Sequence, residues 1–203
     1  MTKPLSLIGM SGVGKSFWAK RLEADGWVRR DCDGEIAAAL GTLVRPEPGE
    51  EPVHALGRWM GMPWHEGYAA REAEYLALEE RVTRTALAEL PARGVLDTTG
   101  SVIYLSAPLL AALRARTRVV YLRTPAERCA AMLRLYLEEP KPVVWGGAFA
   151  AGDEAPEAAL PRCYEELLRI RDARYAALAH VVIDAPDLAG FDLAQFLARM
   201  PPG

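Results

Sequence analysis

A glycine-rich segment near the N-terminus restricts the fold of this chain more than any other feature of its sequence. Residues 9–16 read GMSGVGKS and fit the phosphate-loop pattern G-x-x-x-x-G-K-[ST]. An apolar run at residues 5–8 precedes this segment, and residues 16–24 follow it with the apolar spacing of a helix. This motif requires a strand that leads through a glycine-rich loop into a helix, so we expect a nucleotide-binding α/β fold.

The phosphate loop also predicts roles for individual residues. Its glycines let successive backbone N–H groups point at phosphate oxygens, and the helix N-terminus adds a partial positive charge. The expected nucleotide-binding residues of the loop are Gly9, Ser11, Gly12, Val13, Gly14, Lys15 and Ser16. We expect Lys15 at the β- and γ-phosphates and Ser16 at a Mg²⁺ ion, whose charge offsets that of the transferring phosphoryl group.

Further along the chain, short apolar or β-branched runs alternate with stretches rich in Ala, Leu, Arg and Glu. The expected strands are residues 5–9, 27–30, 94–97, 118–122 and 180–184. Strands that alternate with helical segments predict a parallel sheet with helices on both faces, which is a three-layer α/β fold. A chain of 203 residues can bury one core of this kind, so we expect a single domain over residues 1–203.

Two irregular segments interrupt this alternation. Residues 42–66 are rich in proline and glycine, and a second irregular stretch covers residues 138–156. Long irregular segments in a compact domain usually serve as binding loops or lids. We expect a substrate-binding excursion over about residues 42–90, including a helix from about Gly67 to Leu90, and a lid over the second stretch. The Trp and Met residues of the first segment either line an acceptor site or form a small satellite core.

Acidic side chains follow two of the expected strands. Asp31 and Asp33 come after the second strand, and Asp97 ends the third. In an open α/β sheet, ligands bind beyond the carboxyl ends of the strands, so these carboxylates could reach Mg²⁺ through water or act on a substrate hydroxyl as an orienting group or base. Alternatively, Asp33 caps the helix that begins near Gly34, and Asp97 ends its strand in a plain turn.

The composition excludes several other classes of protein. With 27 acidic and 24 basic residues and a formal net charge of -3, the chain should have no bulk affinity for nucleic acid. The three cysteines lack the spacing of a metal site and indicate reduced thiols. No apolar stretch approaches the ~20 residues that a membrane span needs. We therefore expect a monomeric cytoplasmic protein that acts on a small molecule and binds neither nucleic acid nor membrane.

Several segments together resemble the shikimate kinases, a family of nucleoside-monophosphate-kinase-like P-loop proteins. Besides the phosphate loop, Asp31–Ile36 is similar to the family's Asp-Thr-Asp-x-x-Ile segment. Arg71–Glu74 is similar to its Phe-Arg-x-x-Glu segment, and Arg171–Tyr175 to its Arg-x-x-x-Tyr helix. The resemblance covers most of the chain except residues 42–66, and it implies the strand order 2-3-1-4-5 and the use of ATP and Mg²⁺.

The resemblance also implies which residues bind metal and substrate. It places Asp31 in the Mg²⁺ environment, so the expected metal-binding residues are Ser16, Asp31 and Asp97. It makes Asp33 the residue that binds the substrate hydroxyls and acts as base. The other expected substrate-binding residues are Arg71, Glu74, Thr99, Gly100 and Arg171. The two arginines of this set would grip a carboxylate, which suits the fork of a guanidinium group.

Two segments depart from the family's pattern. The sequence VLDTTGS stands where the family has a segment ending in Thr-Gly-Gly-Gly, so only Gly100 remains, and Thr99 and Ser101 should reshape the pocket. In the expected lid, Lys141 and the following proline replace an Arg-Pro pair, and Lys141 still brings positive charge to the phosphates. Arg134 stands where the family has an arginine that stacks on adenine.

These features together lead to a functional hypothesis. The resemblance implies ATP- and Mg²⁺-dependent phosphorylation of a hydroxyl on a carboxylate-bearing metabolite, with shikimate as the first candidate and Lys15, Asp33 and Lys141 as catalytic residues. Two alternatives stay open. One is a P-loop kinase for another acceptor, such as a sugar acid, a nucleoside monophosphate or an antibiotic. The other is a nucleotide-binding regulatory module without transfer activity, which the altered glycine segment favours.

Overall fold

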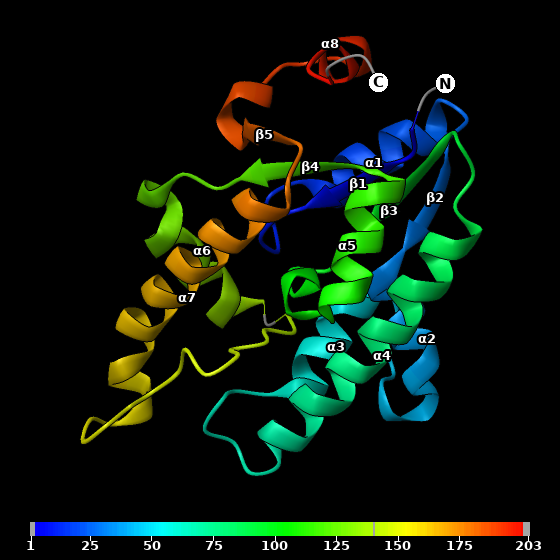
Figure 1. The fold of residues 1–203 in the computed structure, drawn as a ribbon. Helices are drawn as coiled ribbons and strands as arrows, with labels where there is room; N and C mark the ends of the chain where they lie inside the picture. The colour runs from blue at the N-terminus through cyan, green and yellow to red at the C-terminus, as the bar shows by residue number, and fades with distance from the viewer. Residues whose placement is uncertain (1–2, 140, 201–203) are drawn as a thin grey trace.

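The chain folds around a five-stranded parallel sheet. The computed structural model describes residues 3–139 and 141–200 (Figure 1). The strands are β1 (Leu5–Ile8), β2 (Val28–Asp31), β3 (Gly94–Asp97), β4 (Arg118–Arg123) and β5 (Val181–Asp184). They pair in parallel in the order β2-β3-β1-β4-β5, which confirms the expected strands to within a residue at their ends and confirms the expected order.

Helices connect the strands and cover both faces of the sheet (Figure 1). The α-helices are α1 (Lys15–Ala24), α2 (Cys32–Leu40), α3 (Pro52–Met60), α4 (Tyr68–Glu89), α5 (Ala107–Arg116), α6 (Cys129–Glu138), α7 (Pro156–Leu178) and α8 (Leu193–Ala198). Short 3₁₀ turns lie at Gly41–Leu43, Val102–Tyr104, Ala126–Arg128 and Ala185–Leu188. Within the described ranges, no helix combines the length and the apolar character needed to cross a membrane. The three cysteines are free thiols, as expected.

Alternate side chains of the strands enter two separate apolar cores, because successive residues of a strand point to opposite faces. On one face, Leu7 and Leu122 pack with residues of α1 and α8, where the ring of Trp18 stacks on Phe196 with centroids 4.2 Å apart. On the other face, a larger core joins the sheet to helices that include α2, α4, α5 and α7. The expected three-layer α/β architecture is therefore confirmed.

The segment at residues 42–66 contains a helix, which the sequence analysis did not predict. Helix α3 begins at Pro52, where the missing N–H of proline is harmless, and it ends before Gly61, which has a φ of 75°. The proline and glycine that suggested a loop thus mark the two ends of this helix. Apolar residues of the segment pack partly buried against the larger core, among them Trp59, Met62 and Trp64. Of the two interpretations of these residues, their packing favours a contribution to the core.

The connection between α6 and α7 is irregular, as expected for the second segment. Residue 140, which falls inside the expected lid, lies outside the described residues. We call residues 141–155 the α6–α7 loop; it contains turns but no helix or strand. Val143, Val144 and Trp145 are buried in the larger core, so the first part of this loop is packed against the rest of the protein.

Candidate active site

The phosphate-loop sequence lies between β1 and α1, as the motif requires. Gly9 has a φ of 141°, and a Cβ atom there would lie 2.5 Å from the carbonyl oxygen of Leu122 on β4. A larger residue at this position would therefore push the loop away from the sheet. Gly12 and Gly14 also have positive φ angles, at 79° and 104°. The curled backbone of the loop thus depends on glycine at several positions.

Lys15 is the first residue of α1 and is buried against the loop. Its Nζ donates hydrogen bonds to the carbonyl oxygens of Gly9 at 2.9 Å and Met10 at 3.0 Å. Burial lowers the pKa of Lys15, and the carboxylates of Asp97 and Asp33 oppose this shift. The loop lysine and two of the expected site carboxylates therefore form one electrostatic cluster.

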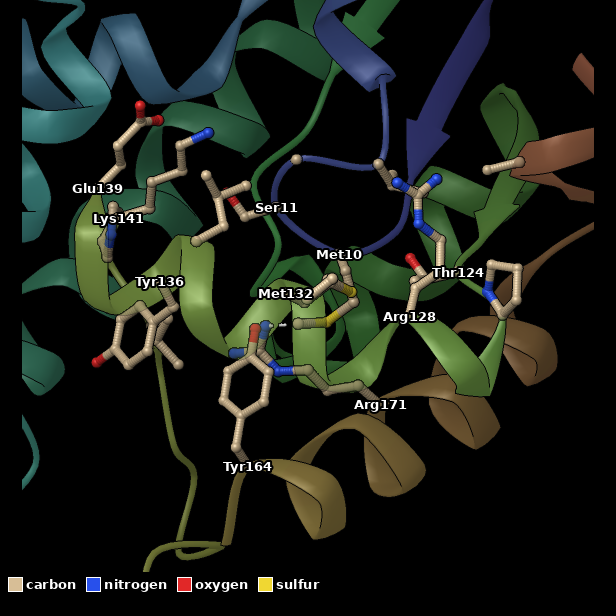
Figure 2. Close-up of a pocket in the computed structure, with 18 residues that line it drawn as sticks. Met10, Ser11, Thr124, Arg128, Met132, Tyr136, Glu139, Lys141, Tyr164 and Arg171 are labelled. Atoms are coloured by element: carbon tan, nitrogen blue, oxygen red, sulfur yellow. Dashed lines mark hydrogen bonds between the residues drawn. The ribbon is translucent and has the colours of Figure 1, made fainter. Parts of the chain in front are cut away.

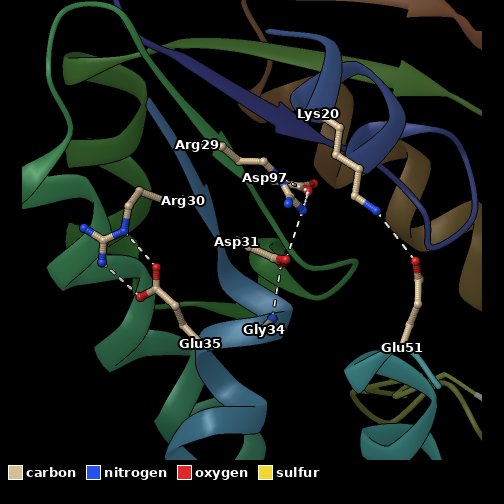
Figure 3. Close-up of polar contacts among 8 residues, drawn as sticks. All are labelled: Lys20, Arg29, Arg30, Asp31, Gly34, Glu35, Glu51 and Asp97. Atoms are coloured by element: carbon tan, nitrogen blue, oxygen red, sulfur yellow. Dashed lines mark hydrogen bonds and ion pairs between the residues drawn. The ribbon is translucent and has the colours of Figure 1, made fainter. Parts of the chain in front are cut away.

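The two carboxylates expected at the metal lie on neighbouring strands. β2 and β3 pair with Asp31 opposite Asp97, so both side chains leave the sheet at the same edge. Arg29 links them, because its Nη2 lies 2.6 Å from Asp97 Oδ2 and 3.0 Å from Asp31 Oδ2 (Figure 3). Asp31 also caps α2 by accepting a hydrogen bond from the backbone N–H of Gly34 at 3.2 Å. The helix cap considered for Asp33 is thus supplied by Asp31.

These residues fit a Mg²⁺ ion that is held mainly by nucleotide phosphates and water. Ser16 is exposed at the start of α1, and the buried Oδ1 of Asp97 has no hydrogen-bond partner among the described residues. In the same part of the chain, no group of three or more His, Cys, Asp or Glu side chains could hold a metal by itself. Mg²⁺ usually keeps several waters and binds one or two carboxylates together with substrate phosphates, which is what this arrangement allows.

Asp33 lies in the first turn of α2, partly buried and within electrostatic reach of the loop lysine. Burial raises the pKa of Asp33 to about 6; Lys15 opposes this shift, whereas Asp97 and Asp31 add to it. The hydroxyl of Tyr75 on α4 donates a hydrogen bond to Asp33 Oδ1 at 3.4 Å. Near neutral pH, Asp33 is therefore an ionised carboxylate whose proton affinity suits a general base.

The altered glycine segment binds a buried acid that the sequence analysis did not identify. The hydroxyls of Thr99 and Ser101 donate hydrogen bonds to the two oxygens of Glu79 on α4, the second at 2.6 Å. Glu79 is fully buried, and burial raises its pKa to about 7 against the opposing effect of the two hydroxyls. The signal that could have revealed it was its spacing, since Tyr75, Glu79 and Thr83 lie four residues apart on the buried face of α4.

Arg171 on α7 joins the altered glycine segment to the α6–α7 loop. Its Nη1 donates to the carbonyl oxygen of Gly100 at 3.1 Å, and its Nη2 donates to that of Val144 at 2.6 Å. A Cβ atom at Gly100 would lie 3.3 Å from the backbone nitrogen of Ser11, so the segment also approaches the phosphate loop closely. Arg171 is 2% exposed, and its Nε is buried with no hydrogen-bond partner among the described residues. Its Nε is therefore a buried donor that could bind a ligand.

A cavity beside the phosphate loop brings several of the expected residues together. Its walls come from the loop, α6, the start of the α6–α7 loop and α7 (Figure 2). Ser11, Lys141 and Arg171 all line this cavity. Arg128, which directly precedes α6, lines it as well, whereas Arg134 is exposed on that helix. Arg128 is therefore better placed than Arg134 to reach a ligand in the cavity.

Arg71 contacts backbone carbonyl groups near the start of α4. Its Nε donates to the carbonyl oxygen of Met60 and its Nη2 to that of Glu66, both at 3.0 Å. Glu74, three residues later, is exposed. Tyr75, one turn beyond Arg71, is the α4 residue whose side chain contacts the expected base. Arg71 thus ties together the chain between α3 and α4, and its contacts do not bring it to the other expected substrate residues.

The chain is similar over nearly its whole length to proteins of one family. No family model matches it. The shikimate kinases of Acinetobacter baumannii strains AYE and SDF are each 31% identical over 199 residues, which cover 96% of this chain and 89% of each relative. The structure of an A. baumannii shikimate kinase in complex with shikimate matches with a TM-score of 0.66 and 25% identity, covering 100% of this chain and 97% of that chain. Shikimate kinase from Bacteroides thetaiotaomicron shares the fold, with a TM-score of 0.60 at 16% identity over 97% of this chain and 93% of that chain.

Proposed function

This chain belongs to the shikimate kinase family, and on that premise we propose that it transfers the γ-phosphoryl group of ATP to a hydroxyl of a small carboxylate-bearing metabolite. The observation that carries the proposal is the electrostatic cluster of Lys15 and Asp33 at the carboxyl edge of the sheet. One member can bind the phosphates, and the other can bind the hydroxyl that attacks them. Ligands of open α/β sheets bind at this edge.

In the proposed reaction, the acceptor oxygen bonds to the γ-phosphorus while the bond from that phosphorus to the ADP oxygen breaks. Asp33 accepts the proton of the hydroxyl, for which its pKa of about 6 leaves it ionised at neutral pH. Lys15 offsets the negative charge on the oxygens of the transferred group. Lys141 lies close enough to Lys15 to lower the pKa of that lysine, so the α6–α7 loop brings a second positive charge to the phosphates.

The metal of the proposed reaction would be bound chiefly through the nucleotide. Mg²⁺ would supply charge neutralisation of the phosphates. Ser16 and the strand-end carboxylates would hold it, directly or through water. The backbone N–H groups between Gly9 and Gly14 would bind phosphate oxygens from the other side.

We assign the carboxylate of the acceptor to Arg171, because its buried Nε is a donor without a partner among the described residues. Arg71 stays the second predicted partner of this carboxylate, and its Nε and Nη2 donate to backbone carbonyl oxygens in the structure. Shikimate is the first acceptor to test, since a relative that is 25% identical was solved in complex with it.

One observation favours a different hydroxyl acceptor. Thr99 and Ser101 carry side chains where the resembled family has glycines, and both hydroxyls point to Glu79 in the interior. These side chains would change the shape of the pocket that takes the acceptor. A sugar acid, a nucleoside monophosphate or an antibiotic hydroxyl would be the acceptors to examine next.

The test measures ADP release from Mg-ATP by the purified protein, with and without shikimate at millimolar concentration. We expect shikimate-dependent turnover that Lys15→Ala abolishes. Lys20→Ala is the matched control, because Lys20 is exposed on the same helix and pairs only with the side chain of Glu51 at 3.6 Å in the described structure (Figure 3). ATP binding without stimulation by shikimate would reject this acceptor. Turnover with no acceptor, or ATP binding with no turnover on any hydroxyl acid, would instead favour a regulatory module.

A further inference from the structure

Arg29 on β2 contacts both strand-end carboxylates that we expected at the metal. Its Nη2 lies 2.6 Å from Asp97 Oδ2 and 3.0 Å from Asp31 Oδ2, and its Nε lies 3.2 Å from Asp97 Oδ2 (Figure 3). The Arg29 side chain is 11% exposed and that of Asp97 is 3% exposed, so water screens this pair little. From these contacts we propose that Arg29 is a positioning residue that holds the carboxylate of Asp97 in place. The proposal assigns Asp97, rather than Asp31, to the Mg²⁺–nucleotide complex.

The two oxygens of Asp97 have different surroundings. Oδ2 accepts both hydrogen bonds from Arg29, whereas the buried Oδ1 has no hydrogen-bond partner among the described residues. A buried carboxylate oxygen without a donor or a cation is unfavourable. Asp97 pairs with Leu7 of β1, just before the phosphate loop, and it is the carboxylate that acts most strongly on Lys15. Oδ1 is thus an unused ligand oxygen next to the place where the phosphates and their metal would bind.

Both oxygens of Asp31, by contrast, are already in use. Oδ1 accepts the hydrogen bond from the backbone N–H of Gly34 that caps α2, and Oδ2 pairs with Arg29. A metal or its water shell would have to share each oxygen of Asp31 with the helix cap or the ion pair. Of the two candidate carboxylates, Asp97 is the one with a buried oxygen that has no other hydrogen-bond partner among the described residues.

Arg29 does not compete with a metal for Asp97, because its two donors share the oxygen that faces away from the free one. Residues that hydrogen-bond the far side of a metal-binding carboxylate hold its orientation, and their loss typically lowers metal affinity about 10- to 100-fold. The planar guanidinium can contact Asp97 through two donors and still reach Asp31, which the single ammonium group of a lysine would do less well. This role rests on the proposed function, since it requires a nucleotide that binds together with Mg²⁺.

Calorimetric titration with ADP, in Mg²⁺ and again in EDTA, tests the proposal without any turnover. For Arg29→Gln we expect unchanged affinity for ADP in EDTA. The increase in ADP affinity that Mg²⁺ produces should be about 10- to 100-fold smaller than in the wild-type protein. Arg29→Lys should keep part of that gain. A merely structural role for Arg29 would instead weaken binding equally in both conditions.

Arg30→Gln is the matched control, because Arg30 is the next residue of β2 and pairs with Glu35 and Glu89 on the opposite face of the strand. Arg30→Gln should retain the full increase in ADP affinity that Mg²⁺ produces. A retained effect in Arg29→Gln would overturn the proposal.

A second comparison decides the matter even if Arg29→Gln fails to fold. Asp97→Asn should lose more of the increase in ADP affinity that Mg²⁺ produces than Asp31→Asn does. The reason is that Asp31 serves the helix cap and the ion pair. The reverse order would overturn the proposal. Failure of the wild-type protein to bind ADP in either condition would be a different result, because it would reject the nucleotide-dependent function itself.

Discussion

Replacing Glu79 with glutamine should remove a loss of stability that the wild-type protein suffers as the pH rises. Glu79 is fully buried, and burial raises its pKa from 4.5 to about 7. Between these values the folded chain keeps a proton that the unfolded chain has released, so the free energy of unfolding falls with increasing pH. Glutamine has nearly the same shape and no charge to bury; its carbonyl oxygen can accept a hydrogen bond from one of the two hydroxyls, and its amide N–H can donate to the other.

The size of the effect follows from the two pKa values. A change from 4.5 to about 7 corresponds to about 3 kcal/mol of unfolding free energy once the pH lies above the folded pKa. The part of it that develops between about pH 5 and pH 8 is about 2.5 kcal/mol. Below the unfolded pKa, Glu79 is protonated in both states and the penalty vanishes.

Urea unfolding of both proteins at about pH 5 and pH 8 measures this difference. The stability of Glu79→Gln relative to wild type should rise by about 2.5 kcal/mol between the two conditions. Glu80→Gln is the control: burial would raise the pKa of Glu80, but hydrogen bonds from Ser106 and Arg84 lower it overall. The stability that its carboxylate adds is already almost fully present at pH 5, so the difference between Glu80→Gln and wild type should stay nearly constant between the two conditions. A constant difference between Glu79→Gln and wild type at both pH values would refute the reasoning.

Three further predictions concern the site. Asp33→Asn should lower kcat about 10²- to 10⁴-fold with ATP binding retained, and wild-type kcat/KM should fall below about pH 6, where Asp33 gains a proton; a flat pH–rate profile would exclude Asp33 as base. Glu72→Ala should speed amide hydrogen exchange at Trp145, whose N–H now donates to Glu72 at 2.5 Å, and should raise KM for ATP; unchanged exchange would contradict this anchoring of the loop. Gly9→Ala should destabilise the protein by about 1–3 kcal/mol in urea unfolding, because its Cβ would meet Leu122; full stability would show that the loop can yield.

The sheet and the phosphate loop were predictable because their signals are local. Each strand is a short apolar run, and the glycine motif specifies both its backbone and its neighbours in sequence. The strand order came from the family resemblance. The positions of Lys15, Asp33 and Asp97 were predictable for the same reason, since each follows or ends a strand at the carboxyl edge of the sheet.

The remaining parts of the site depend on helix phase and on contacts between distant segments. Arg71 matches a family pattern by sequence, and its role stays a prediction. Tyr75 and Glu79 follow it by one and two turns of α4 and reach the interior, which only the phase of the helix reveals. Arg29 gave no signal, because its importance comes from a strand partner nearly seventy positions away. Helix α3 escaped prediction because the proline and glycine at its ends are also the residues that mark loops.

Strand β2 lies at the edge of the sheet with the sequence VRRD, and none of its four side chains is fully buried. Its register against β3 therefore cannot be set by apolar alternation, which fixes register wherever one face of a strand is buried. Successive side chains meet carboxylates on opposite faces instead: Arg29 meets Asp97, and Arg30 meets Glu35 and Glu89. Ion pairs of the two arginines thus hold this strand in its register. Rising ionic strength should weaken the exposed pair of Arg30 with Glu89 first, whereas the buried pair of Arg29 with Asp97 should keep the carboxylates of the site aligned.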